Sequence, residues 1–194
     1  MASPTLALPA AGGTRPRGVL TQAMIFVVVG GTMFFGALLA AYLHMRKISH
    51  PFPAEGTEID EYWGNVMVGT MFMSAFTVEW GVSALRRNER TQALAGFGLT
   101  VALGLCFLNL LSFSSGHAAF DAVSNSYGLV VTAMVMALGI VAGIGVALCT
   151  LTLFRVAGRQ LLEPDTEQPR ATAIYWHFAV AASMAVWYTV IVLK

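Results

Sequence analysis

Five long apolar stretches alternate with short polar segments along this chain. They cover about residues 19–45, 62–85, 92–113, 126–154 and 171–193. A helix crosses a hydrocarbon core of about 30 Å with about 20 apolar residues. Each stretch is long enough to do this. The pattern therefore predicts an all-α, polytopic membrane bundle of five transmembrane helices, which forms a single domain over residues 20–194.

The polar segments between and before these stretches are expected to be loops and a tail. Proline, which ends helices, interrupts the first and last loops at Pro51, Pro53, Pro164 and Pro169. Residues 1–19 are rich in Ala, Pro, Gly and Thr. The apolar run after them is longer than that of a signal peptide and lacks a small-residue cleavage site. We therefore expect residues 1–19 to be a disordered cytoplasmic tail and the run to be the first membrane helix.

The basic residues predict the orientation of the bundle. If the N-terminus is cytoplasmic, that side holds eight of the eleven Lys and Arg residues, namely Arg15, Arg17, Arg86, Arg87, Arg90, Arg155, Arg159 and Arg170. The other side holds Arg46, Lys47 and Lys194. Because cytoplasmic loops carry the excess of positive charge, we predict that the N-terminus is cytoplasmic and the C-terminus is outside.

Composition agrees with a lipid environment. Hydrophobic residues make up 57% of the chain and charged residues 11%, whereas soluble domains carry about 25% charged residues. A net charge of +1 gives no basic surface for nucleic acid. Cys106 and Cys149 each lie inside an apolar stretch. We expect them to be packing residues and not parts of a disulfide framework or a metal site.

Ionisable residues at membrane depth mark candidate functional sites, because a charge in hydrocarbon is costly. Glu79 is the one that lies clearly within an apolar stretch, two turns before Arg86. Two interpretations are open: a carboxylate that collects protons, or one that reaches the interface or pairs with a basic side chain. The second is favoured. The four histidines, which place no pair on one helix face, are His44, His50, His117 and His177.

Without such a histidine pair, we expect no haem or copper ligation by this chain alone. Small residues give a different signal, for close helix packing. Gly139 and Gly143 form a GxxxG step in the fourth apolar stretch, and such steps let helix backbones approach one another in lipid. Packing within this bundle is the favoured interpretation, and packing on another subunit is the alternative.

Several short motifs, taken in order, resemble a known family. The last apolar stretch opens with Tyr175-Trp176-His177-Phe178, and the first contains Met33-Phe34-Phe35 followed by Tyr42. Asn65 lies near the start of the second stretch and Tyr127-Gly128 at the head of the fourth. The pattern is similar to subunit III of haem-copper (cytochrome c) oxidases, in the short five-helix form that lacks two N-terminal helices of the longer form.

The chain departs from this family where the family has polar residues within its helices. Gly31 stands where a carboxylate normally precedes the two phenylalanines, and Val180 replaces an aspartate after the last motif. Leu138-Gly139-Ile140-Val141 occupies the place of a motif with two histidines, GFHGLHV. Leu111 and Ser114 replace a glutamine and a glutamate. The resemblance therefore implies a diverged subunit that keeps the scaffold and has lost groups able to feed protons to a catalytic partner.

The resemblance implies a non-catalytic accessory subunit of a respiratory terminal oxidase in the cell (inner) membrane. Haem and copper are then expected in partner subunits, catalytic subunit I above all, and phospholipid is expected to bind to this chain. The alternatives are a subunit of a nitric oxide reductase-type complex, a small transporter, or an assembly factor. The residues expected to contact lipid or a partner subunit are Phe34, Phe35, Tyr42, Glu79, Tyr175, Trp176 and His177, the last three as polar anchors at the cytoplasmic end.

Overall fold

A computed structural model describes residues 18–48, 61–117, 126–159 and 167–192. This part of the chain is helical apart from short turns and contains five helices long and apolar enough to cross a membrane. The predicted all-α membrane bundle is thereby confirmed. The predicted tail falls almost wholly outside the described residues. The elements are α1 (Val19–Ile48), α2 (Glu61–Arg86), α3 (Arg90–His117), α4 (Ser126–Ala157), α5 (Glu167–Trp187) and the π-helix η1 (Tyr188–Val192), which continues α5.

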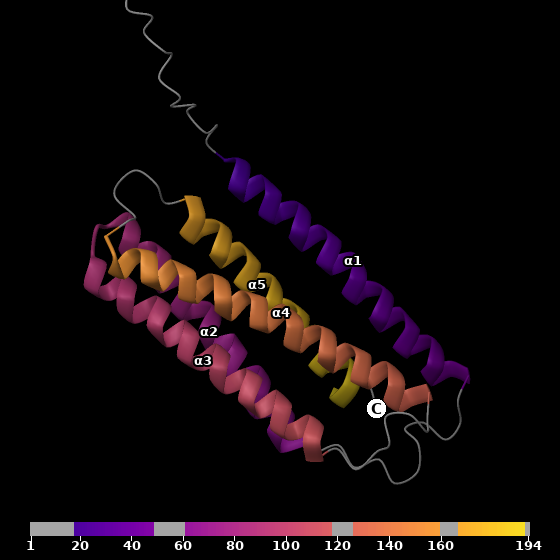
Figure 1. Cartoon of the computed structure of the whole chain (residues 1–194). Coiled ribbons are helices and arrows are strands. Elements are labelled where there is room, and N and C mark those ends of the chain that lie inside the picture. The colour runs from indigo at the N-terminus through magenta and orange to yellow at the C-terminus, as the bar shows by residue number, and fades with distance from the viewer. Residues whose placement is uncertain (1–17, 49–60, 118–125, 160–166, 193–194) are drawn as a thin grey trace, which may run out of the picture.

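Helix α5 lies inside the bundle, and the other helices surround it. It packs against α1, α2 and α4, and it is the most deeply buried of the five, whereas α1 is the least. Figure 1 shows α1 along one side of the bundle and the paired helices α2 and α3 along the other. α2 and α3 are joined by a tight turn in which Asn88 has a φ of 58°, a left-handed conformation that asparagine tolerates.

The backbones of α2 and α3 touch at two glycines. A Cβ added to Gly96 would lie only 2.7 Å from the Cα of Gly81, so no larger side chain fits between the two helices at this point. The hydroxyls of Thr77 and Thr100 hydrogen-bond across the same crossing at 2.8 Å. Close approach and an interhelical hydrogen bond are the means by which helices associate without a hydrophobic driving force.

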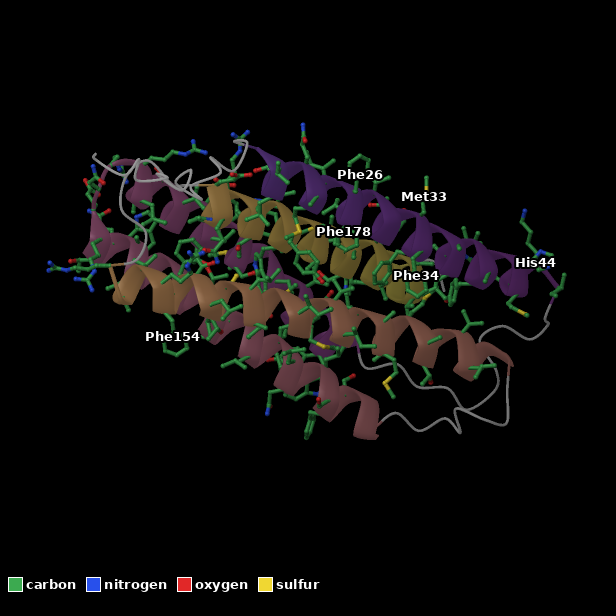
Figure 2. The ribbon with its side chains drawn as sticks, turned by 45° about the horizontal axis from the view of Figure 1, so that its top comes forward. Phe26, Met33, Phe34, His44, Phe154 and Phe178 are labelled. Carbon is green, nitrogen blue, oxygen red and sulfur yellow. The ribbon has the colours of Figure 1, made fainter. Side chains whose placement is uncertain are left out.

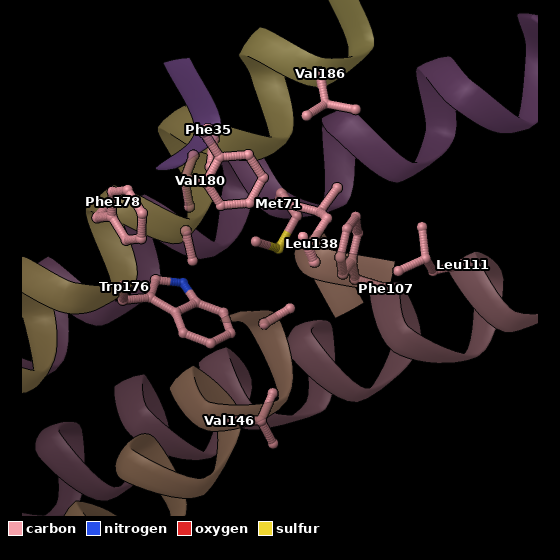
Figure 3. Close-up of a cluster of buried hydrophobic side chains, with 14 of the residues drawn as sticks. Phe35, Met71, Phe107, Leu111, Leu138, Val146, Trp176, Phe178, Val180 and Val186 are labelled. Atoms are coloured by element: carbon pink, nitrogen blue, oxygen red, sulfur yellow. The ribbon is translucent and has the colours of Figure 1, made fainter. Parts of the chain in front are cut away.

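Trp176 of α5 fills the centre of the bundle. Its side chain is completely buried, and its ring lies against Gly104 of α3 and Gly145 of α4, where an added Cβ would approach it to 2.7 and 2.8 Å. Its Nε1–H donates a 2.9 Å hydrogen bond to the hydroxyl of Ser74 in α2. One side chain therefore contacts three of the other helices. Figure 3 shows it among the buried side chains of the core.

Helix α1 is attached along one stripe and at its first turn. Phe35 and Tyr42 are its buried side chains, and the ring of Phe35 packs edge-on against Phe178 of α5 at 6.1 Å. At the N-terminus of α1, the carboxylate of Glu167 accepts hydrogen bonds from the backbone N–H of Leu20 at 2.8 Å and from that of Thr21 at 3.3 Å. Glu167 thus satisfies N–H groups that a helix N-terminus leaves without partners.

Among the described residues, the GxxxG step of α4 brings no other helix backbone close. A Cβ on Gly143 would meet nothing within 4 Å, and one on Gly139 would make an ordinary 3.4 Å contact with Leu111. The glycines that carry close helix contacts are Gly31, Gly81, Gly96, Gly104 and Gly145. The favoured interpretation is therefore not supported for Gly143, since a Cβ there would have no neighbour within 4 Å among the described residues.

We predict that Gly96→Val lowers the free energy of unfolding by about 1–3 kcal/mol, because the new side chain forces the α2 and α3 backbones apart. Gly98→Val is the matched control on the same helix, since a Cβ there meets open space; we expect it to change stability by less than about 0.5 kcal/mol. The stability of both variants is measured in a Cys106→Ser background, in which heating exposes the buried Cys149 thiol. Maleimide labelling of that thiol follows the unfolding transition. Equal effects of the two variants would contradict the backbone contact.

A second prediction concerns the central indole. Trp176→Phe removes the donor to Ser74 and leaves space beside Gly104 and Gly145, so it should destabilise the fold by about 2–3 kcal/mol. Trp80→Phe is the control: this indole is 42% exposed, and we expect a change below about 0.5 kcal/mol. The same thiol-labelling transition reports both variants. A wild-type midpoint for Trp176→Phe would show that the indole does not hold the helices together.

Candidate functional site

The described part of the chain contains no group of three or more His, Cys, Asp or Glu residues that could hold a metal ion. Its buried serine and threonine side chains are Ser74, Thr100, Thr152, Thr172, Ser183 and Thr189. Each of them hydrogen-bonds to a backbone carbonyl or to another side chain. These hydroxyls are therefore uncharged and internally satisfied, whereas the buried indole nitrogen of Trp187 has no hydrogen-bond partner among the described residues.

Glu79 of α2 and His177 of α5 form an ionisable pair at that surface. Glu79 Oε1 lies 3.8 Å from His177 Nε2, and the two side chains are 60% and 43% exposed. The other ring nitrogen, Nδ1, lies 2.7 Å from the carbonyl oxygen of Ala173. A carbonyl oxygen only accepts hydrogen bonds, so Nδ1 carries the hydrogen and donates it. Nε2 is therefore the ring edge that faces Glu79.

The spacing of Glu79 and His177 from two arginines on the same helices indicates how deep this pair lies in the membrane. Glu79 lies seven residues before Arg86, and His177 lies seven residues after Arg170. At 1.5 Å per residue, each is about 10 Å from an arginine at the same end of the bundle. With these arginines at the membrane interface, as the positive-inside rule expects, the pair would lie inside a hydrocarbon core of about 30 Å but short of its midplane.

The sequence indicates correctly that Glu79 lies near one end of its helix. It does not indicate that His177 lies beside it. The two residues are 98 positions apart and meet only when α5 packs on α2. Their equal spacing from Arg86 and Arg170 was a usable signal, since antiparallel neighbours bring such positions to one depth. The favoured interpretation is that Glu79 reaches the interface or pairs with a basic side chain, and the 3.8 Å separation places His177 within ion-pair reach when it is protonated.

Two of the three expected polar anchors are instead part of the core. Trp176 is completely buried and Tyr175 is 4% exposed, with the Tyr175 hydroxyl donating to the carbonyl of Val141 at 3.1 Å. The prediction that they contact lipid or a partner is therefore wrong. Of the three, His177 remains at the surface, because it alone lies on the outward stripe of α5.

The aromatic residues of α1 are likewise divided between the surface and the core of the bundle. Phe34 is 53% exposed, whereas Phe35 and Tyr42 are 4% and 1% exposed. Phe35 and Tyr42 thus hold α1 on the bundle and are not available to lipid, which corrects the expectation for both. Figure 2 shows that Phe26 and Met33 also project from α1 away from the other helices. The outward side of α1 is apolar, as a lipid-facing surface requires.

Gly31 lies beneath the ring of Phe178. A Cβ on this glycine would approach Cζ of Phe178 to 2.5 Å, so the phenyl ring occupies the place that a side chain at position 31 would fill. Val180, at the other position where the resemblance leads one to expect an acid, is 5% exposed. Both sites are therefore closed by apolar groups.

Comparisons with known proteins agree with this architecture. The family model for cytochrome c oxidase subunit III matches residues 14–193. Proteins named cytochrome c oxidase subunit 3 are similar at low identity: the one from the sea urchin Strongylocentrotus purpuratus is 27% identical over 162 residues, covering 80% of this chain and 62% of that protein. The one from Thermostichus vulcanus is 24% identical, covering 80% and 78%.

A third relative, from Synechocystis, is 26% identical over 168 residues and covers 86% of this chain and 67% of its own length. The chain thus spans less than two thirds of the sea urchin protein and about two thirds or more of the two bacterial ones. The resemblance noted from the sequence motifs is confirmed. With a family match along nearly its whole length and five membrane-spanning helices, the chain belongs to the cytochrome c oxidase subunit III family.

Proposed function

We propose that this chain is a non-catalytic accessory subunit of a respiratory haem-copper oxidase, in which it stabilises the catalytic subunit. The family match over residues 14–193 is the observation that carries the proposal. The chain's own chemistry agrees with it, since the described residues offer buried hydroxyls and no cluster of metal ligands. Haem and copper would then be held by the partner subunits.

The closed interior supports a structural role over a role in proton delivery. A proton relay through a membrane protein is built from ionisable groups such as Asp, Glu and His at depth. Here the places of two such groups are taken by Gly31, which lies under Phe178, and by the buried Val180. The pair formed by Glu79 and His177 lies at the surface and not within the bundle.

The outward surfaces suit lipid and neighbouring subunits in the cell membrane. Large apolar side chains on α1 are exposed, among them Phe26 at 77% and Met33 at 72%, and the positive-inside rule places the N-terminus in the cytoplasm. We include bound phospholipid and this orientation in the proposal. Phe34 and the glycine step at Gly139 and Gly143, which is open at Gly143, are its further candidate contacts.

The proposal predicts that this chain, carrying an affinity tag and extracted gently from its native membrane, brings down a haem-containing oxidase near one to one. An absorption spectrum and protein identification on the captured material provide the measurement, with an untagged strain as the control. Oxygen and nitric oxide consumption by the same sample separate an oxidase from a nitric oxide reductase-type complex.

Deleting the chain tests its role within such a complex. The remaining oxidase should keep its haem spectrum and its initial rate per haem while its thermal midpoint falls. A chain that comes down alone and colourless, while other respiratory complexes stay intact, would overturn the proposal in favour of a transporter or an assembly factor.

A further inference from the structure

The outward edge of the pair formed by Glu79 and His177 presents two hydrogen-bond acceptors side by side. Because Nδ1 of His177 donates to the carbonyl of Ala173, the Nε2 of the neutral ring carries a lone pair. The carboxylate of an ionised Glu79 likewise only accepts. Their 3.8 Å separation is too long for a hydrogen bond between them. A donor placed between the two atoms would bond to both.

This arrangement is costly if lipid covers it. With Arg86 and Arg170 at the membrane interface, as the positive-inside rule expects, the pair would lie about 10 Å further along its helices, within the hydrocarbon region. Acyl chains offer no hydrogen bond, and ionisable groups at such depth normally face protein or a water-filled cavity. Glu79 and His177 are each about half exposed on the surface of this chain. A donor from a partner would satisfy both acceptors there.

The surroundings of the pair are those of a helix-binding surface. On α2, Phe72, Phe76 and Trp80 are 46%, 59% and 42% exposed, and they lie within one or two turns of Glu79. The rings of Phe72 and Phe76 pack edge-on at 5.1 Å. Large aromatic side chains around a central polar group are typical of the energetic centre of an interface. An anionic lipid headgroup is disfavoured because Glu79 would repel it.

We propose that the face of α2 and α5 centred on Glu79 and His177 receives a transmembrane helix of a partner subunit that presents a lysine or arginine between the two acceptors. Its positive charge complements the carboxylate of Glu79, and its N–H groups donate to the two acceptors. This inference rests on the proposed function, since it requires a partner within the membrane. It adds which face is used and what chemistry the partner contributes.

Photo-cross-linking in the native membrane tests the inference. A benzophenone amino acid replaces Phe76, three residues from Glu79 on the same exposed side of α2, and the tagged chain is recovered with its covalent products. The control position is Phe26, which is 77% exposed and lies seven residues, or about 10 Å, from the start of α1. Glu79→Gln and His177→Asn are then combined with each photoreactive position, and the amount of each variant in the membrane is checked.

The proposal predicts that position 76 cross-links to one identified oxidase subunit, at a transmembrane peptide containing Lys or Arg. Glu79→Gln should lower that yield at least fivefold, while products from position 26 stay unchanged. Replacing the partner's basic residue by leucine should have the same effect as Glu79→Gln. Cross-linking of position 76 to lipid only, or to a second copy of this chain, would overturn the inference.

The tagged wild-type chain, which carries no photoreactive residue, distinguishes failure of this inference from failure of the accessory-subunit proposal. If the tagged wild-type chain brings down the oxidase but position 76 labels only lipid, this inference fails and the accessory-subunit proposal stands. If the yield at position 76 is high but unaffected by Glu79→Gln, the face is an interface without the proposed polar contact, which also refutes the inference. If the wild-type chain captures no oxidase, both proposals fall.

Discussion

The position of Trp176 is the constraint on which the rest of the bundle depends. An indole fits at the centre of a helical bundle only where the neighbouring helices carry no side chain, and Gly104 and Gly145 provide that space on α3 and α4. Its polar N–H must also be satisfied there, because an unpaired donor in an apolar interior is costly. Ser74 of α2 accepts it. The single side chain of Trp176 thereby positions α2, α3 and α4 against α5.

This packing determines where the ionisable groups lie. With Trp176 directed inward, the next residue, His177, is rotated by about 100° around α5 and reaches the surface beside α2. Glu79 lies there because it occupies the outward side of α2, whereas Ser74 and Val78 of the same helix are buried. The surface pair is thus a consequence of the core contact. The interior among the described residues is correspondingly uncharged, since its polar side chains are hydroxyls and indoles.

Helix α1 is held differently from the other four. It contributes few buried side chains, and Glu167 hydrogen-bonds to its first turn from the start of α5. A carboxylate at a helix N-terminus also interacts favourably with the helix dipole. One end of α1 is therefore fixed by a polar contact and its middle by Phe35 against Phe178. The outward side of this helix, with Phe26 and Met33, is left for lipid or a partner (Figure 2).

The sequence by itself determined the fold class and the number of membrane helices, because apolar runs of sufficient length have few alternatives in a chain so poor in charge. The motif that begins at Tyr175 also indicated the family correctly. Which of those residues face outward was decided only by the tertiary structure, since Tyr175 and Trp176 could have served equally as interfacial anchors. The same holds for the glycines: GxxxG spacing predicted contact at Gly143, whereas Gly96 and Gly104 carry it. Spacing along a chain identifies small residues, but which face of a helix meets a neighbour depends on the packing of all five helices. The pairing of Glu79 with His177 across α2 and α5 likewise exists only once that packing is complete.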